Sequence, residues 1–477
     1  MKFYTSALAL ASCATAIVVP AGSAPKYDVD VAIIGGGSSG IHAAINLKDD
    51  GLKVAVIEKQ HQIGGHAQTY INPVTKKHTN IGVTVFENTK TVQKYFSRLG
   101  VATGTNNNLL TAKTSYKQYD FTLGIPIPAQ SDSQAAATSQ ALQAALQVYA
   151  QNVLPRYPWI DQGYFIPNPV PEELLMPFGE FAKQNNFSAI VPLISQLNWY
   201  TGNTTALPAI YGLKNFGPGL LQAATTGFLV SASGDTRDLY TAAASVLGDS
   251  VYLNSEVIKV QRNAPGKGVV VVFKQNGKII TLKARKLVVA IPQTRANTRV
   301  FDLCDKERAL FTRFKALGYV CGIAHIPGVE TGLQNVGALT PSNLPLAPGA
   351  SGFFPTGSPN DFLVDVGSPD DGFTPADAEA LMREELATIA RLGGIPADAP
   401  KKATFPVLES HAPFSLHVTG HDIAQGFYRD LIALEGYRNT YWTGAAFAGH
   451  NSGLIWNWND GTVLPAIKRD LELETSL

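Results

Sequence analysis

Val29-Asp-Val-Ala-Ile-Ile-Gly-Gly-Gly-Ser-Ser-Gly40 is the stretch that decides how this chain folds. Apolar residues at 29–34 predict a buried strand, and a helical pattern follows the glycines. The glycines at 35, 37 and 40 have the spacing G-x-G-x-x-G, which allows a tight turn, a close approach to a pyrophosphate and close packing of helix on strand. A second apolar run, 54–57, ends in Glu58, about 20 residues past the motif, where a carboxylate can accept from ribose hydroxyls. The segment therefore predicts a dinucleotide-binding β-α-β unit.

The same glycines fit two other interpretations. Gly36-Gly-Ser-Ser-Gly40 matches G-x-S-x-G, the nucleophile elbow of serine hydrolases, which also lies between a strand and a helix. A glycine turn in some other α/β protein is the second alternative. Because Glu58 stands where a ribose-binding carboxylate is expected, the dinucleotide interpretation is favoured over both.

The composition is that of a globular protein. The chain has 477 residues, of which 45% are hydrophobic and 16% charged, enough for two or three domains with sizeable cores. Its formal net charge is +1 and it has no basic stripe, so no nucleic-acid partner is expected. Neither H-E-x-x-H nor C-x-x-C occurs, so no metal site is predicted.

The N-terminal residues 1–24 are typical of a secretory signal peptide. Lys2 is followed by an apolar stretch at 7–19 and then by small residues, and this stretch is short for a membrane span. We expect a secreted or secretory-pathway protein without a stable membrane anchor; an uncleaved anchor is the alternative. Asn186 and Asn203 begin N-glycosylation sequons.

Cysteine usage leaves two alternatives open. Cys13 lies in the predicted signal peptide, and Cys304 and Cys321 remain. In a secreted chain this pair can form one disulfide, or both can stay free thiols.

The predicted organisation is an α/β fold with two interleaved domains. Residues 25–99, 230–292 and 406–477 are assigned to the dinucleotide-binding domain, and residues 100–229 and 293–405 to a substrate domain with a mixed sheet and a helical cap. Within them we predict helices at 91–99, 131–153, 236–247 and 376–392, a helix starting at Pro171, strands at 81–87, 251–254, 257–261, 286–292 and 319–326, a hairpin of 268–274 with 278–282, and a loop at 341–359.

A second glycine-rich region lies near the C-terminus. Residues 441–462 read as a strand, a glycine-rich turn and the start of a helix, a second pattern suited to contact with a dinucleotide. A single cofactor contacted from both ends of the chain must be large and extended.

These motifs in this order resemble the FAD-dependent amine oxidase and phytoene desaturase superfamily. The signal peptide, Gly64-Gly-His66 and the ending Thr443-Gly-Ala445 make the chain look most like the secreted fungal branch of flavoproteins similar to β-cyclopiazonate dehydrogenase. The resemblance covers the whole mature chain, is specific in the cofactor-binding part and is poor in the cap. It implies a Rossmann-type FAD-binding domain interleaved with a substrate domain.

The resemblance also implies a role for individual residues. Pyrophosphate contacts fall on the first glycine motif, the adenosine ribose on Glu58, the adenine on a strand at Val257, and the ribityl chain and flavin on the two other glycine segments. The residues implied to bind FAD are Gly35, Gly37, Ser39, Gly40, Glu58, Gly64, Gly65, His66, Val257, Gly444, Ala445, Ile455 and Trp456.

Two departures from the superfamily pattern stand out. Amine oxidases usually carry arginine after Gly-Gly, where this chain has His66, and an acidic residue after the C-terminal glycine, where it has Ala445. The loss of the acidic residue weakens the case for amine substrates. His66 suggests covalent attachment of FAD through its imidazole; a phosphate-binding or merely structural histidine is the alternative.

Catalytic residues are harder to choose. His325, His411, His417, His421 and His450 are candidate bases by residue type only, and each can equally be structural. His450 and Trp456 are preferred as catalytic residues because they lie in the flavin-contacting stretch.

The predicted function is FAD-dependent removal of a hydride from a small, largely apolar metabolite, by desaturation or oxidative cyclisation. Electrons would pass to dioxygen or another acceptor. The alternatives are an amine or amino-acid oxidase that produces hydrogen peroxide, an NAD(P)-dependent dehydrogenase and a non-catalytic flavin-binding protein.

Overall fold

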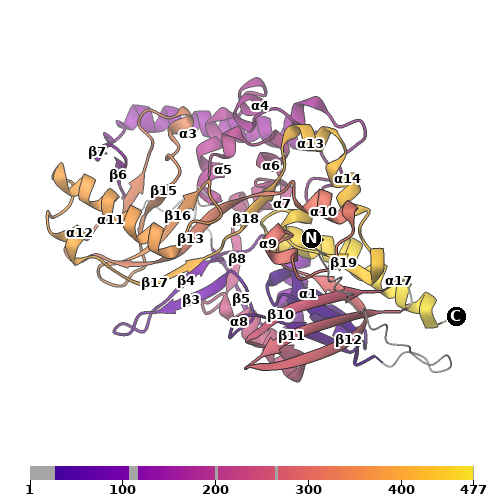
Figure 1. Ribbon diagram of the computed structural model, residues 1–477. Helices are drawn as coiled ribbons and strands as arrows, with labels where there is room; N and C mark the ends of the chain where they lie inside the picture. Colours follow the sequence, from indigo (N-terminus) through magenta and orange to yellow (C-terminus); the bar gives the residue numbers. More distant parts are fainter. Residues whose placement is uncertain (1–26, 107–115, 199–201, 264–266, 476–477) are drawn as a thin grey trace, which may run out of the picture.

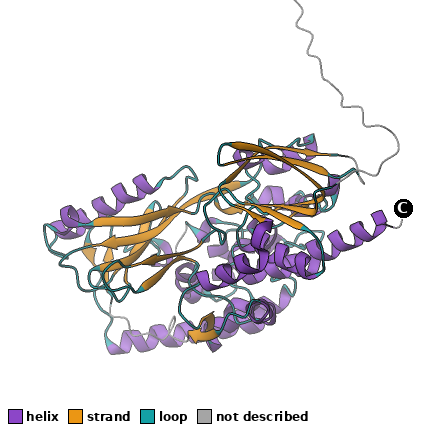
Figure 2. Ribbon diagram, turned by 90° about the horizontal axis from the view of Figure 1, so that it is seen from below, coloured by secondary structure: helices purple, strands orange, loops and turns teal. Residues whose placement is uncertain are grey.

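The computed structural model describes residues 27–106, 116–198, 202–263 and 267–475. The predicted signal peptide, 1–24, lies outside these ranges. Two groups of strands lie side by side, and a layer of helices runs across the top of Figure 1. Seen from below in Figure 2, the two groups of strands are separate, with helices around and between them.

The first sheet is built on the predicted β-α-β unit, which the structure confirms. Strand β1 (Val29–Ile34) pairs in parallel with β2 (Val54–Ile57) on one side and β12 (Lys278–Val289) on the other. Strand β2 is apolar throughout and β1 is apolar except for Asp30, as expected where helices cover both faces of a parallel sheet. The strand order is β10-β11-β12-β1-β2-β9, with β19 also paired to β12. The other strands are β9 (Val251–Tyr252), β10 (Ser255–Arg262), β11 (Val269–Gln275) and β19 (Thr440–Trp442).

The second sheet has the order β17-β13-β16-β15-β14-β6-β7, with β18 paired to β13. Its longest strand, β13 (Lys315–His325), is antiparallel to its neighbours β16 and β17 and contains the predicted strand at 319–326 almost entirely. The other strands are β6 (Lys117–Asp120), β7 (Ile125–Pro126), β14 (Leu333–Asn335), β15 (Gly349–Pro355), β16 (Asp361–Ser368), β17 (Thr404–Ser410) and β18 (Phe414–His417). Two small ribbons pair β3 (Ala67–Ile71) with β4 (His78–Gly82) and β5 (Thr103–Asn106) with β8 (Phe228–Ser231).

Helices of the cap and of the second sheet begin at strong N-terminal signals. Ser131 and Gln134 form a capping box at the start of α3, and Thr374 and Asp377 form another at the start of α11. The α-helices near the first sheet are α1 (Ser38–Asp49), α2 (Lys90–Arg98), α8 (Arg237–Leu247), α9 (Arg295–Thr298) and α10 (Asp305–Phe311). The cap contains α3 (Asp132–Val148), α4 (Phe178–Gln184), α5 (Val191–Leu197), α6 (Ala209–Lys214) and α7 (Pro218–Thr226). The remaining α-helices are α11 (Pro375–Arg391), α12 (Ala399–Lys402), α13 (Gly420–Ala424), α14 (Phe427–Ile432), α15 (Ala445–Ala448), α16 (Ser452–Trp458) and α17 (Leu464–Thr475).

Short helical turns join these elements. A π-helical turn, η1 (Tyr149–Val153), continues α3, so the helix predicted at 131–153 is confirmed over nearly its full length. The others are η2 (Leu154–Arg156), η3 (Glu172–Leu174), η4 (Ser188–Ile190), η5 (Thr204–Ala206), η6 (Gly248–Ser250), η7 (Pro341–Asn343), η8 (Tyr437–Asn439) and the π-helical η9 (Asn459–Val463).

Four local predictions differ from the structure. The predicted loop 341–359 contains β15, because this Gly- and Pro-rich segment finds partners in β14 and β16. The strand predicted at 81–87 instead ends at Gly82, whose φ of +89° turns the chain out of the ribbon. The helix predicted from Pro171 is only the short turn η3. Strands β17 and β18, most of which lie in the segment assigned to dinucleotide binding (406–477), pair with β13 in the second sheet.

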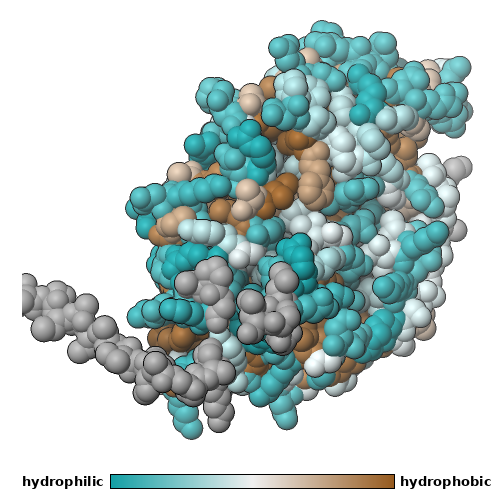
Figure 3. All heavy atoms as spheres, turned by 90° about the vertical axis from the view of Figure 1, so that its right-hand side faces the viewer, coloured by the Kyte–Doolittle hydropathy of each residue, from teal (hydrophilic) through white to brown (hydrophobic). Residues whose placement is uncertain are grey.

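Each sheet has its own apolar core. The larger core joins the first sheet to the cap helices and to α16, and the smaller one lies between the second sheet and α11. Within the described ranges, no helix has the length and apolarity needed to cross a membrane. The face shown in Figure 3 mixes hydrophilic residues with groups of apolar ones. Cys304 and Cys321 are both free thiols, and Cys321 is buried.

Candidate active site

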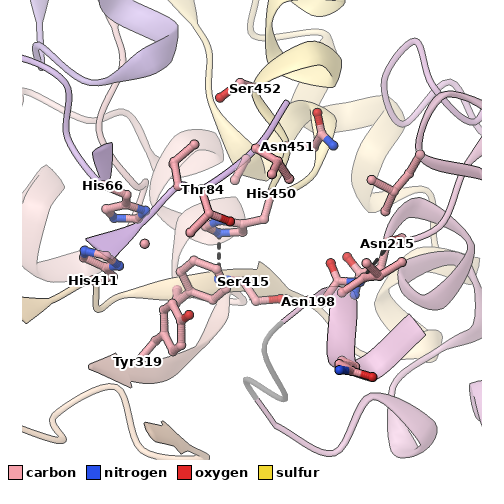
Figure 4. Close-up of a pocket in the computed structure, with 18 of the residues that line it drawn as sticks. His66, Thr84, Asn198, Asn215, Tyr319, His411, Ser415, His450, Asn451 and Ser452 are labelled. Carbon is pink, nitrogen blue, oxygen red and sulfur yellow. Dashed lines mark hydrogen bonds between the residues drawn. The ribbon is translucent and has the colours of Figure 1, made fainter. Parts of the chain in front are cut away.

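A cavity of about 1670 Å³ lies where the first sheet, the second sheet and the cap meet. The N-terminal glycine motif, the Gly-Gly segment, the ribbon end at Gly82 and the C-terminal stretch line one part of it. Helices α3 and α5 of the cap and strands β6 and β14 line the rest. Figure 4 shows the histidine-lined part of this cavity.

The N-terminal glycines fold as the motif requires. Gly35 has a φ of +103°, and a β-carbon there would lie 2.7 Å from the Ala290 carbonyl oxygen. A β-carbon on Gly40 would lie 2.0 Å from the Gly35 oxygen, so only glycine lets α1 pack this close to the turn. The Glu58 carboxylate accepts hydrogen bonds from Gly36 N at 2.6 Å and Gln60 N at 2.7 Å, which fixes it at the edge of the cavity.

The Gly-Gly segment passes directly over the first motif. A β-carbon on Gly65 would lie 3.1 Å from the Gly37 α-carbon, and both glycines line the cavity. Arg237 on α8 supports this segment from behind, since its guanidinium donates to the carbonyl oxygens of Ile63 and, at 3.1 Å, Ala67. An arginine from a distant helix therefore holds the backbone around His66.

The C-terminal stretch closes the cavity from the opposite side. Gly444, Ala445, His450 and Ile455 line it. Helix α16 begins beside them, and the side chain of Asn451 caps it by accepting from Gly453 N at 2.8 Å and Leu454 N at 3.4 Å.

Trp456 lies behind the first glycine motif and does not line the cavity. The side chain is fully buried, stacks on His42 and donates from its indole nitrogen to the Ser38 hydroxyl at 3.1 Å and carbonyl at 3.3 Å. Ile455 faces the cavity, and one residue along a helix turns the side chain by about 100°. The structure therefore gives Trp456 a supporting position, away from any reacting atoms in the cavity.

Three histidines gather in the cavity. The His66 and His411 rings are stacked with centroids 4.3 Å apart, and the His66 and His450 rings are parallel at 6.3 Å. Nε2 of His450 accepts a hydrogen bond from Ser415 N at 2.7 Å, and its ring packs on Phe414 at 3.8 Å. Figure 4 shows these side chains with Tyr319 and Thr84.

Burial keeps these histidines neutral. It lowers the pKa of His66 to about 4, with Lys59 contributing, and that of His450 to about 3, with His66 contributing. It also lowers the pKa of His411 well below its ordinary value. At neutral pH each imidazole therefore carries one N–H donor and one acceptor nitrogen, and the acceptor nitrogen of His450 is already paired with Ser415 N.

Most of the predicted cofactor-binding residues come together in this one cavity. Gly40, Val257 and Trp456 do not line it: Gly40 packs α1 against the turn, and Val257 packs against the core of the first sheet. The predicted residues that line it are Gly35, Gly37, Ser39, Glu58, Gly64, Gly65, His66, Gly444, Ala445, His450 and Ile455.

Several residues around the site were not singled out from the sequence. Tyr319 and Gly82 line the cavity, Arg237 supports the Gly-Gly segment, and Asn451 caps α16. A lone glycine in a strand pattern is a sequence signal for close backbone approach, and Gly82 gave that signal. Arg237 and Tyr319 carried none, because only the fold brings them to the site.

The cavity fits an extended dinucleotide such as FAD. Glu58, Gly444 and Ile455 line it together with Gly37 and Gly65, whose backbones face each other closely. A side chain at Gly65 would crowd this passage, and bare backbone is what a pyrophosphate approaches. Glu58 stands at the ribose end.

Comparisons with known proteins agree with this geometry. The model of the family described as flavin containing amine oxidoreductase matches residues 38–455. The chain is 51% identical to FAD-dependent oxidoreductase dpchF of Colletotrichum higginsianum, over 98% of each chain. It is 31% identical to β-cyclopiazonate dehydrogenase of Aspergillus flavus, over 90% of this chain and 91% of that protein.

Solved structures show the same fold at low identity. A fatty acid isomerase from P. acnes that produces CLA superposes with a TM-score of 0.71 at 18% identity, covering 92% of this chain and 98% of the isomerase. A putrescine oxidase variant superposes with a TM-score of 0.61 at 15% identity, covering 92% of this chain and 99% of the oxidase. With its glycine cradle and cavity, this chain therefore belongs to the flavin-containing amine oxidoreductase family, and it is an FAD-dependent oxidoreductase.

Proposed function

We propose that this enzyme oxidises a small, uncharged and largely apolar metabolite, by desaturation or oxidative cyclisation. Bound FAD supplies the hydride acceptor. The observation that carries the proposal is the charge of the cavity wall. Among the described residues that line it, only Glu58 and Lys59 are ordinarily charged at neutral pH, and both follow strand β2 at the dinucleotide end.

The rest of the wall suits a neutral ligand with apolar and hydrogen-bonding parts. The cap and strand β7 contribute apolar side chains such as Leu142, Leu193 and Ile125. Carboxamides are interspersed with them. The carboxamide residues that line the cavity include Gln118, Gln130, Gln196, Asn198, Asn215, Gln334, Asn335 and Asn343.

An amine or amino acid would be poorly accommodated. Burying an ammonium or carboxylate group without an opposite charge is costly, and this part of the wall offers neither kind of partner within the described ranges. The Glu58 carboxylate is engaged by two backbone N–H groups. The relatives compared above are named as an FAD-dependent oxidoreductase and a β-cyclopiazonate dehydrogenase, neither of them by an amine substrate, although the fold is also that of a putrescine oxidase.

The experiment is an aerobic turnover assay with matched panels. The FAD-loaded enzyme is offered putrescine, cyclohexylamine and L-amino acids in one panel, and uncharged hydroaromatic compounds and cyclic ketones in the other, with peroxide and substrate loss followed. The proposal predicts turnover confined to the uncharged panel. Turnover of the amines would establish the amine oxidase alternative, and reduction by no donor at all would favour a non-catalytic flavin protein. Peroxide formation would identify dioxygen as the electron acceptor.

We also propose that His66 attaches FAD covalently. Its imidazole is neutral because burial lowers its pKa, so a ring nitrogen is free to act as a nucleophile. His66 would form an N–C bond to a methyl carbon of the flavin as the methyl C–H and imidazole N–H bonds break, and dioxygen would take up the two electrons and two protons released, giving hydrogen peroxide. Flavin that stays with acid-precipitated wild-type protein but is released from His66→Ala supports the linkage; complete release from wild type contradicts it.

Passage through the secretory pathway is the last part of the proposal. It rests on the signal-peptide pattern at 1–24 and on the sequons at Asn186 and Asn203, both of which are exposed on the cap. Mature protein in the medium should begin after about residue 24 and shift in mass on treatment with an N-glycosidase. Retention in the cell with an intact N-terminus would contradict this part.

A further inference from the structure

His411 lies in the cavity with both ring nitrogens unpaired. It follows strand β17, is 2% exposed, and neither Nδ1 nor Nε2 has a hydrogen-bond partner. The ring fits there because Gly82 has no side chain: a β-carbon on Gly82 would lie 2.4 Å from the His411 Cε1 atom. The neighbouring rings of His66, at 4.3 Å, and Tyr319, at 5.6 Å, contact its surface and leave the nitrogens unsatisfied.

This arrangement points to a missing ligand. A neutral imidazole has one N–H donor and one nitrogen acceptor, and burial keeps His411 neutral. A buried polar atom without a partner carries an uncompensated desolvation penalty, so such groups in native proteins are normally paired. His450 illustrates the difference, since it shares the same cavity and is paired to Ser415 N. Figure 4 shows His411 beside His66 at the edge of the open space.

We propose that His411 binds the substrate by hydrogen bonding to an uncharged hydroxyl or carbonyl group. This deepens the proposed function and rests on it, because it assigns the polar group that the neutral metabolite presents to the histidine-lined part of the cavity. A hydroxyl can donate to the free ring nitrogen, and either group can accept from the ring N–H.

The test uses two probes that differ in one hydrogen-bond donor, 4-chlorophenol and 4-chloroanisole. Their binding to the FAD-loaded enzyme is measured by equilibrium dialysis. Wild type should prefer the phenol by roughly tenfold, the scale of one hydrogen bond to a buried partner. His411→Leu should abolish the preference, and His411→Asn, which keeps a donor and an acceptor, should restore part of it.

Controls separate this role from general damage. His421→Leu changes an exposed histidine outside the cavity and should leave the preference intact. His411→Phe provides a second apolar variant if the leucine variant does not fold. Visible absorbance confirms that each variant retains flavin.

Three results would overturn the assignment. One is an unchanged phenol preference in the apolar variants, and another is binding of neither probe by wild type. The third is a loss of FAD affinity of roughly tenfold or more in His411→Leu, which would make FAD the missing partner. An intact phenol preference without turnover of any uncharged donor would refute the proposed function and leave the His411 assignment standing.

Discussion

Gly65 crosses Gly37 so closely that a β-carbon on Gly65 would lie 3.1 Å from the Gly37 α-carbon. Two glycine segments, one before and one after strand β2, thus present bare backbone to the same passage. Gly65 also has a φ of +56°, a backbone conformation that residues other than glycine rarely adopt.

Gly65→Ala should therefore weaken FAD binding by at least about tenfold, through crowding together with about 1–2 kcal/mol of backbone strain. Flavin fluorescence titration of the apoprotein measures the change. Gly51→Ala is the matched control, because Gly51 has a φ of +83° and nothing within 4 Å of its would-be β-carbon. If both substitutions weaken FAD binding equally, the crossing of the two segments is not what matters.

Trp456→Phe should affect stability more than chemistry. The indole donates to the hydroxyl and carbonyl of Ser38, and a phenyl ring cannot. We expect a loss of about 1–2 kcal/mol in unfolding free energy and a modest loss of FAD affinity, with the rate of flavin reduction at saturating FAD changed less than about threefold. Denaturant unfolding and stopped-flow reduction measure these. A hundredfold slower reduction in fully loaded protein would restore Trp456 as a catalytic residue.

Glu87 gives the fold a pH dependence. It is buried, Asn451 donates to it at 3.0 Å, and burial together with Asp161 raises its pKa to about 8. Between its unfolded value of about 4.5 and 8 the folded state holds the extra proton, so this group's contribution to stability falls as pH rises through that window. Lys214 opposes this at higher pH, because burial lowers its pKa to about 7.

Glu87→Gln should remove the contribution of Glu87 to the pH dependence of stability. The glutamine can still accept from Asn451, so at pH 8 the variant should be about 1–3 kcal/mol more stable relative to wild type than at pH 5. Thermal melting across that range gives the comparison, with the exposed Glu256→Gln as control. If the difference in thermal stability between wild type and Glu87→Gln did not vary with pH, Glu87 would be ionised over the whole range.

The ion pair between Arg262 and Glu307 should be among the costliest to break. Arg262 is 1% exposed and Glu307 is fully buried, and they share two hydrogen bonds, one of 2.7 Å. Arg262→Leu leaves a buried carboxylate unpaired, which should cost about 3–5 kcal/mol of unfolding free energy. The half-exposed pair of Arg98 and Asp49 is the control, where Arg98→Leu should cost less than about 1 kcal/mol. If urea unfolding showed equal losses of unfolding free energy in Arg262→Leu and Arg98→Leu, the role of burial would be contradicted.

Local signals in the sequence were enough to predict the β-α-β unit, the hairpin of β11 with β12, and the capped helix α11. Each depends on residues close together in the chain. Strand β15 could not be predicted, because its partners β14 and β16 are set by tertiary pairing and its own segment is rich in glycine and proline.

The site was predictable to the extent that it is made of backbone. Glycine spacing identified the segments that face the cavity, since glycine marks close backbone approach. The side chains were harder to predict. Trp456 follows Ile455, which faces the cavity, and therefore points away from it. The sequence did not distinguish His411 from the four other candidate histidines, because its position in the cavity depends on strand β17 and on the close approach of Gly82.

The central claim is that the oxidised substrate carries no charge. The most direct test is anaerobic mixing of the FAD-loaded enzyme with metabolite extract of its own organism, split by ion exchange into neutral, basic and acidic fractions. Loss of the oxidised flavin bands with the neutral fraction alone is the predicted result. Bleaching by the basic fraction alone would contradict the account and establish an amine oxidase.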